Sequence, residues 1–400
     1  MIAKKSDKAL NIVKSVKIFA TSANLTRKDV DVGLIYTDKD TVSSAVFTKN
    51  SVKAACVLYD IELLKENRNI KAVIVNSGNA NACNSNGFEA IDAVTTSLSG
   101  KLNIDKNQIF VASTGIIGED LPYEKINASL DKLISQTDNS SDLFAESIMT
   151  TDTVKKQYAL ECSFLGTRFN IGAVAKGAGM IHPNMGTMLS FIVTDIKISQ
   201  KMLDSALLYA VNHSFNRISV DGDMSTNDTV FIMSTQEAKN DKIVDENELY
   251  RFFEDNLTNV CTNLAKMIVK DGEGATKIAE IVVVGAIKEK DAEKIARGVS
   301  NSLLVKTALF GQDPNWGRIL DAAGYSFEHL DVQKLNMFIG DNLVFSKGKS
   351  TNFDKKVLQE YMKNEEIEIL IDLGVGACTY NMWFSDISYN YVKINAEYHT

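Results

Sequence analysis

A glycine followed by a threonine lies at the centre of residues 176–195, KGAGMIHPNMGTMLSFIVTD. The Thr187 hydroxyl can act as a nucleophile once a base removes its proton, and the base need not be a histidine. If the chain is cut just before Thr187, the freed α-amine, with an ordinary pKa near ~7.7–8.0, can take that proton at neutral pH. Gly186 favours such a cut because glycine adopts strained backbone dihedrals at low cost. Judged alone, a Gly-Thr pair is nevertheless better explained as a loop that enters a strand.

Histidines and glycine loops offer little alternative chemistry. No GxSxG elbow accompanies the histidines, so structural or surface positions are favoured for at least three of them. They are His182, His213, His329 and His399. Paired glycines in residues 176–180 and 374–379 lack the complete pattern of a phosphate-binding loop and are typical of tight turns. A hydrolase or transferase with so few usable histidines needs another base, which makes the amine of Thr187 attractive.

Metal chemistry is weakly indicated. Asp221 and Asp223 in SVDGDMSTND have the spacing of a DxD metal-binding pair. No third ligand is visible nearby, and Gly222 with the Ser, Thr and Asn that follow is typical of an ordinary polar turn. The five cysteines are far apart and form no CxxC or Cys/His cluster, so neither a zinc site nor a disulfide framework is predicted. We expect no metal and no cofactor.

Composition excludes several classes of protein. Apolar residues make up 45% of the 400 residues and charged residues 24%, as in soluble globular proteins. The net charge of -8, with lysines and acids interleaved, argues against a nucleic-acid partner. No window approaches the ~18 apolar residues of a membrane span, and the N-terminus lacks the pattern of a signal peptide. We expect a cytoplasmic protein without a membrane partner.

The elements that would position Thr187 alternate between strands and helices. Strands are predicted at residues 32–38, 43–49, 72–78, 108–114, 187–198, 228–235 and 278–287, with a hairpin over 157–174. Helices are predicted at 60–66, 89–102, 123–136, 142–151, 200–215, 247–269, 290–310 and 353–363. From residue 335 on, the pattern predicts mixed strands. Asn315-Trp316 is expected to form a turn whose tryptophan is an anchor residue. This alternation indicates α/β or α+β layers. The most plausible domain boundary lies near residues 238–246. It predicts a nucleophile-bearing domain, 1–240, and a C-terminal domain, 241–400.

Seven further motifs change the standing of Thr187. In chain order they are VFTKNSVKAA (46–55), VNSGNANAC (75–83), STGIIG (113–118), SVDGDMSTNDT (219–229), KDGEGATK (270–277), FGQDPNWGRI (310–319) and INAEYHT (394–400). Together with residues 176–195, in this order and at this spacing, they make nearly the whole chain resemble the glutamate N-acetyltransferase / ornithine acetyltransferase family of arginine biosynthesis.

The resemblance implies both a fold and a reaction. The fold is a layered αββα sandwich similar to N-terminal-nucleophile hydrolases, with a smaller C-terminal α/β domain. By this resemblance the precursor would cut itself between Gly186 and Thr187 into an alpha chain, 1–186, and a beta chain, 187–400, which would assemble as a heterotetramer of two copies of each. Thr187 would take an acetyl group from N-acetylornithine, release ornithine and pass the acetyl group to glutamate. Some members of the family also accept acetyl-coenzyme A.

The resemblance also assigns roles to residues. Thr114 and Gly115 match the pair that forms the oxyanion hole. Substrate contacts are implied for Lys176, which could hold a carboxylate, for Glu273, near the ornithine amine, and for Asn395 and Thr400 in the C-terminal tail.

The sequence departs from the family pattern at three places. The family often has alanine at the position of Gly186 and a small residue at that of His182. Residues 371–383, IDLGVGACTYNMW, differ from the polar glycine-rich version, which leaves substrate contacts from that region open.

Two other functions remain open. A related amidohydrolase or aminopeptidase would use the same nucleophile but pass the acyl group to water, giving free acetate whether or not glutamate is present. A non-catalytic scaffold would show no acetyl exchange after cleavage.

Overall fold

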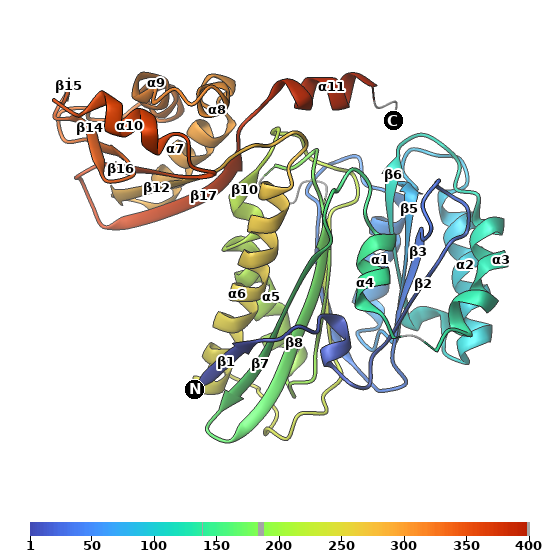
Figure 1. The fold of residues 1–400 in the computed structure, drawn as a ribbon. Helices are drawn as coiled ribbons and strands as arrows, with labels where there is room; N and C mark the ends of the chain where they lie inside the picture. Colours follow the sequence, from blue (N-terminus) through green and yellow to red (C-terminus); the bar gives the residue numbers. More distant parts are fainter. Residues whose placement is uncertain (138, 183–187, 398–400) are drawn as a thin grey trace.

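Two stacked β-sheets form the larger body of the protein (Figure 1). The computed structural model describes residues 1–137, 139–182 and 188–397. The six-stranded sheet has the order β1 (Ile2–Lys5), β7 (Lys156–Phe164), β8 (Thr167–Lys176), β9 (Leu189–Thr194), β11 (Thr229–Ser234) and β4 (Val42–Phe47). The four-stranded sheet has the order β2 (Lys17–Thr21), β3 (Val32–Tyr36), β5 (Ala72–Asn79) and β6 (Ile109–Ile116).

Helices cover the outer face of each sheet, so the body is the predicted αββα sandwich. The six-stranded sheet packs against α5 (Gln200–Asn212) and α6 (Glu248–Lys270), and the four-stranded sheet against α2 (Gly87–Leu102) and α3 (Tyr123–Ile134). Between the sheets lies a shared core, which α1 (Ala55–Glu66) and α4 (Ser141–Ser147) help to close. Short 3-10 helices are η1 (Leu10–Ile12), η2 (Lys106–Gln108) and η3 (Phe215–Arg217).

All six residues of β9, LSFIVT, are buried, because both faces of the sheet are covered. Phe191 faces the core between the sheets, whereas Ile192 faces α5 and α6. β9 pairs antiparallel with β8, with Leu189 opposite Lys176, and parallel with β11. Strands that follow residue 187 therefore lie between β8 and β4, which precede it.

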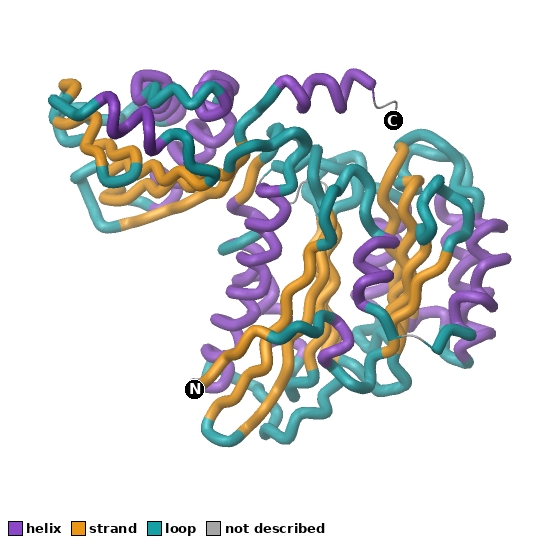
Figure 2. Tube along the Cα trace, in the orientation of Figure 1, coloured by secondary structure: helices purple, strands orange, loops and turns teal. Residues whose placement is uncertain are grey.

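A second body has its own sheet and core. Its sheet has the order β10 (Ile218–Ser219), β17 (Cys378–Ser385), β12 (Ile278–Ala286), β16 (Glu366–Asp372), β13 (Asn336–Ile339), β14 (Asn342–Ser346) and β15 (Lys349–Ser350). Its helices are α7 (Glu289–Asn301), α8 (Leu303–Phe310), α9 (Trp316–Ser326) and α10 (Lys355–Tyr361). The last helix, α11 (Tyr389–Glu397), leaves this body and extends back over the edge of the sandwich (Figures 1 and 2).

The apolar face of α6 packs in the core of the six-stranded sheet. The division of the chain into domains 1–240 and 241–400 stays a prediction. The structure corrects three sequence predictions. The predicted helix 290–310 is two helices, since the Ser302 side chain accepts a hydrogen bond from the Val305 N–H and starts a new one. Asn315-Trp316 begins α9 instead of forming only a turn. Residues 389–397, predicted within mixed strands, form α11. Within the described ranges, no helix is long and apolar enough to cross a membrane.

Candidate active site

Strand ends and loops of the sandwich meet α11 around a cavity of about 110 Å³. The lining is rich in hydroxyl and amide groups, with one carboxylate. It comprises Ala80, Thr114, Gly115, Ile117, Thr150, Thr151, Gly179, Met180, Ser225, Thr226, Asn227, Glu273 and Asn395. Four of the residues singled out in the sequence, Thr114, Gly115, Glu273 and Asn395, are thus brought together. Gly186, Thr187 and Thr400 lie outside the described residues.

Thr114 and Gly115 lie at the end of β6, beside the parallel strand β5. Gly115 pairs with Gly78 and has φ 138°. A Cβ at Gly115 would lie 2.3 Å from the carbonyl carbon of Gly78, so only glycine fits where the two strands approach. This tight pairing fixes the backbone that carries Thr114, whose side chain is only 3% exposed.

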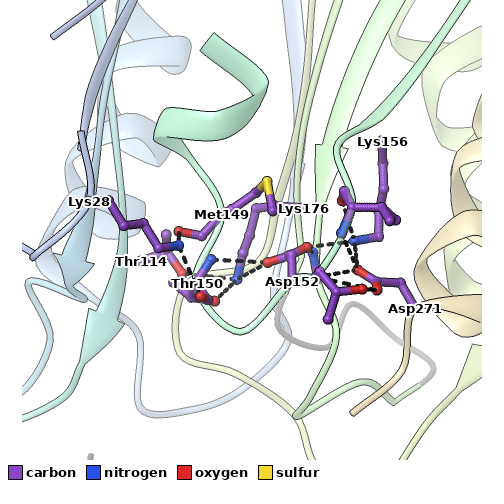
Figure 3. A network of polar contacts seen from close by, with 11 residues as sticks. Lys28, Thr114, Met149, Thr150, Asp152, Lys156, Lys176 and Asp271 are labelled. Atoms are coloured by element: carbon purple, nitrogen blue, oxygen red, sulfur yellow. Dashed lines mark hydrogen bonds and ion pairs between the residues drawn. The ribbon is translucent and has the colours of Figure 1, made fainter. Parts of the chain in front are cut away.

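Lys176 contacts two threonine hydroxyls of the cavity, on Thr114 and Thr150, but is not itself among the lining residues (Figure 3). It is the last residue of β8 and only 1% exposed. Its Nζ lies 2.7 Å from Thr150 Oγ1 and 3.4 Å from Thr114 Oγ1. Burial lowers the pKa of Lys176, and the nearby Asp152 carboxylate opposes that shift. Contact between Lys176 and a substrate carboxylate stays a prediction.

Glu273 and Asn395 also line the cavity. The Glu273 backbone N–H donates to the Ala178 carbonyl at 2.8 Å, which ties the turn after α6 to the loop after β8. The Asn395 side-chain amide, from α11, donates to Glu273 Oε2 at 2.8 Å. A carboxylate held in this way can receive an ammonium group, because carboxylate oxygens accept more than one hydrogen bond.

Gly179→Ala should weaken substrate binding without unfolding the protein. A Cβ at Gly179 would lie 2.4 Å from the Glu273 carboxyl carbon, and the end of a flexible side chain can move away at little cost. The carboxylate would then leave its place beside Asn395. We expect the KM for an ammonium-bearing substrate to rise about tenfold or more, in line with ~1.5–3 kcal/mol for a hydrogen bond to a charged group. Steady-state kinetics with thermal unfolding checks this. Gly100→Ala, on the open surface of α2, is the matched control, and an unchanged KM would contradict the prediction.

The motif SVDGDMSTNDT holds the backbone on both sides of residues 183–187. The Asp221 carboxylate accepts hydrogen bonds from the backbone N–H groups of Met180 and Ile181, at 2.6 and 2.9 Å. The Asp228 carboxylate accepts from the Met188 N–H at 2.9 Å. Asp228 is fully buried, and this burial raises its pKa well above the ordinary value. Asp221 therefore holds the backbone of the loop that follows β8.

Asp221 and Asp223 belong to no candidate metal cluster. Among the described side chains, no group of three or more His, Cys, Asp or Glu could hold a metal ion. His182 directly follows Ile181, whose backbone N–H donates to Asp221. Burial together with the positive charge of Arg297 lowers the pKa of the His182 ring.

Sequence reasoning missed the hydroxyls of Thr150, Thr151, Ser225 and Thr226. Thr150 and Thr151 follow α4 in MTTDT, and Ser225 and Thr226 lie in a loop before β11. No spacing rule connects these two segments. One sequence feature pointed to part of this set: in SVDGDMSTNDT, the two aspartates Asp221 and Asp223 are followed by hydroxyl and amide residues.

Comparisons with known proteins agree with these motifs. A family model described as the ArgJ family matches residues 17–400. The chain is similar to the arginine biosynthesis bifunctional protein ArgJ of Oceanobacillus iheyensis, with 41% identity over 94% of this chain and 92% of that protein. The protein of the same name from Listeria monocytogenes is 43% identical over 94% of this chain and 95% of its own.

A solved relative supports the fold. The crystal structure of arginine biosynthesis bifunctional protein argJ from Bacillus halodurans is 40% identical, covers 53% of this chain and 100% of its own, and gives a TM-score of 0.52. The family model spans the chain almost from end to end, and the relatives match nearly their full lengths. The chain therefore belongs to the ArgJ family.

Proposed function

We propose that the protein transfers an acetyl group from N-acetylornithine to glutamate in arginine biosynthesis, through an acetyl group carried on Thr187. The observation that carries the proposal is the convergence of Thr114, Gly115, Glu273 and Asn395 on one small cavity. These residues come from distant parts of the chain, and the resemblance assigns all of them to one reaction. The backbone at Met188, next to Thr187, is held by the buried Asp228.

The reaction would proceed in two half-steps. The Thr187 hydroxyl attacks the acetyl carbonyl carbon of N-acetylornithine while the α-amine of Thr187 takes the hydroxyl proton. The tetrahedral oxyanion accepts hydrogen bonds from Thr114 and Gly115, and its collapse breaks the C–N bond as the departing amine takes up the proton. The amine of glutamate then attacks the acetyl-threonine ester and regenerates the hydroxyl. Glu273, held by Asn395, would bind the side-chain ammonium of ornithine.

Cleavage before Thr187 would leave fragments of 186 and 400 − 186 = 214 residues. The Bacillus halodurans chain aligns over its whole length and covers 53% of this chain, the share that a 214-residue fragment would have. Eight of the lining residues precede Thr187 and five follow it, so both fragments would have to stay together to keep the cavity. The proposed assembly is a heterotetramer in the cytoplasm, and acetyl-coenzyme A is proposed as a second donor.

One assay tests the proposal. The purified protein is incubated with labelled glutamate and either N-acetylornithine or acetyl-coenzyme A, and N-acetylglutamate, ornithine and acetate are measured. Transfer from N-acetylornithine is expected. Acetate formed at the same rate with and without glutamate would replace the proposal by a hydrolase, and no turnover after verified cleavage would favour a scaffold.

A further inference from the structure

A buried ionic network contacts the cavity residues Thr114 and Thr150, and the reaction described above does not use it (Figure 3). Lys176, Asp152, Lys156 and Asp271 have side chains between 0 and 5% exposed. Asp152 Oδ1 lies 2.7 Å from Lys156 Nζ, and its Oδ2 lies 4.0 Å from Lys176 Nζ. Asp271, after the end of α6, pairs with Lys156 at 2.5 Å. Asp152 is thus the anion that both buried lysines share.

The same carboxylate holds backbone that borders the cavity. Asp152 Oδ1 accepts a hydrogen bond from the Gly177 N–H at 2.6 Å, and Oδ2 accepts from the Thr150 N–H at 3.0 Å. Burial alone would raise the pKa of Asp152, but the charges of Lys176 and Lys156 and the Gly177 N–H hold it well below the ordinary value. Asp152 is therefore an anion at every pH at which the protein would work.

The charge of Lys176 determines which way the cavity hydroxyls donate. A threonine hydroxyl has one donor and two acceptor sites, and an ammonium group has donors only. When Lys176 is a cation, the hydroxyls of Thr150 and Thr114 accept from it, and their own protons are free to point into the cavity. When Lys176 is neutral, its lone pair can accept one of those protons, and the cavity loses a donor.

We propose that Asp152 is a positioning residue: by keeping Lys176 charged, it makes Thr114 and Thr150 donate into the cavity. Among the described residues, the carboxyl groups of Asp152 and Asp228 favour the Lys176 cation, whereas the ammonium groups of Lys156 and Lys28 oppose it. The Lys28 Nζ donates to the carbonyls of Met149 and Thr150, at 2.9 and 3.0 Å, and so holds the same loop from the other side.

The inference can be tested without relying on activity. Protein labelled with ¹³C at the lysine Cε is titrated by NMR, and the Lys176 signal is assigned by its loss in Lys176→Gln. In Asp152→Asn the Lys176 titration midpoint should fall by about one pH unit or more, because an opposite charge within ~4–6 Å shifts a pKa by about 1–3 units. Asp271→Asn is the matched control: it removes a buried carboxylate from the same network that does not contact Lys176, so the midpoint should stay nearly constant.

A second variant, in which the Lys176 titration midpoint should shift in the opposite direction, keeps the test decisive if Asp152→Asn does not fold. Lys156→Met removes a cation that competes for Asp152, so the Lys176 midpoint should rise. An unchanged midpoint in Asp152→Asn, an equal fall in Asp271→Asn, or no rise in Lys156→Met would each overturn the proposal.

A second measurement, the pH dependence of kcat/KM, rests on the proposed function. It should shift in the same direction as the Lys176 titration midpoint. Activity that needs the Lys176 cation is present below the Lys176 pKa and lost above it, so the alkaline limb of kcat/KM should move to lower pH in Asp152→Asn. If the wild type transfers no acetyl group, the proposed function fails, while the NMR titration still decides the role of Asp152. If the wild type is active but the limb does not move, the role of Asp152 fails and the proposed function stands.

Discussion

Thr187→Ala is expected to give a single uncut chain of 44.0 kDa that transfers no acetyl group. Alanine removes the hydroxyl that would attack both the preceding peptide bond and the substrate. Without the cut, residue 187 also has no free amine to act as base. Removal of an enzyme nucleophile lowers kcat by about 10⁶-fold in other systems, so the residual rate should be unmeasurable. Intact mass, N-terminal sequencing and the acetyl-transfer assay together check the result.

Thr187→Ser is the matched control, since serine keeps a hydroxyl and would keep the amine after cleavage. It should cut itself, more slowly, and retain measurable transfer. A stable, uncut wild-type chain that still transfers acetyl groups would contradict the role of the amine as base. Cleavage of Thr187→Ala at the same bond would contradict the role of the hydroxyl.

Thr114→Val is expected to lower kcat by about 10²–10³-fold, the usual effect of removing one donor to an oxyanion. The hydroxyl is buried, and Lys176 would still have Thr150 as its nearer partner, so the loss should appear mainly in kcat and not in KM. Valine keeps the branched shape at Cβ, so the β6 backbone beside Gly78 should be preserved. Steady-state kinetics with each substrate varied separately measures the split.

Thr95→Val provides a control for the loss of a buried threonine hydroxyl. Thr95 is fully buried in α2, where its hydroxyl donates to the Ile91 carbonyl at 2.7 Å, away from the cavity. It should be destabilised to a similar extent as Thr114→Val and keep its kcat. A Thr114→Val enzyme with unchanged kcat would remove Thr114 from the oxyanion hole and leave Gly115 as the only candidate.

The layers of the fold could be predicted because buried strands and helices have hydrophobic patterns that can be recognised within a short stretch of sequence. β9, β11 and β12 each contain an apolar run of three or more residues, and α6 has a clear helical period. The predicted helix boundaries were wrong where a single capping side chain determines where a helix begins. Ser302 interrupts no hydrophobic pattern, yet it caps α8, and Asn315 likewise starts α9 by accepting from the Arg318 N–H at 3.2 Å. Both are recognised N-cap types, so attention to caps would have found them.

The site could be predicted only where a motif marks it. Thr114, Gly115, Glu273 and Asn395 were found through the resemblance, and the structure places them around one cavity. Thr150 and Asp152 could not be found, because their contacts with Lys176 depend on how the loop after α4 meets the end of β8. A lysine and an aspartate 24 positions apart give no periodic signal, and only the fold shows that their charges are buried together.

The placement of β9 and β11 between β8 and β4 has a kinetic consequence for a cut chain. The precursor folds as one molecule, so the encounter of these strands is unimolecular. After a cut before Thr187, the central strands would belong to one fragment and their flanking strands to the other. Refolding from denaturant would then be second order, and the apparent stability would depend on protein concentration.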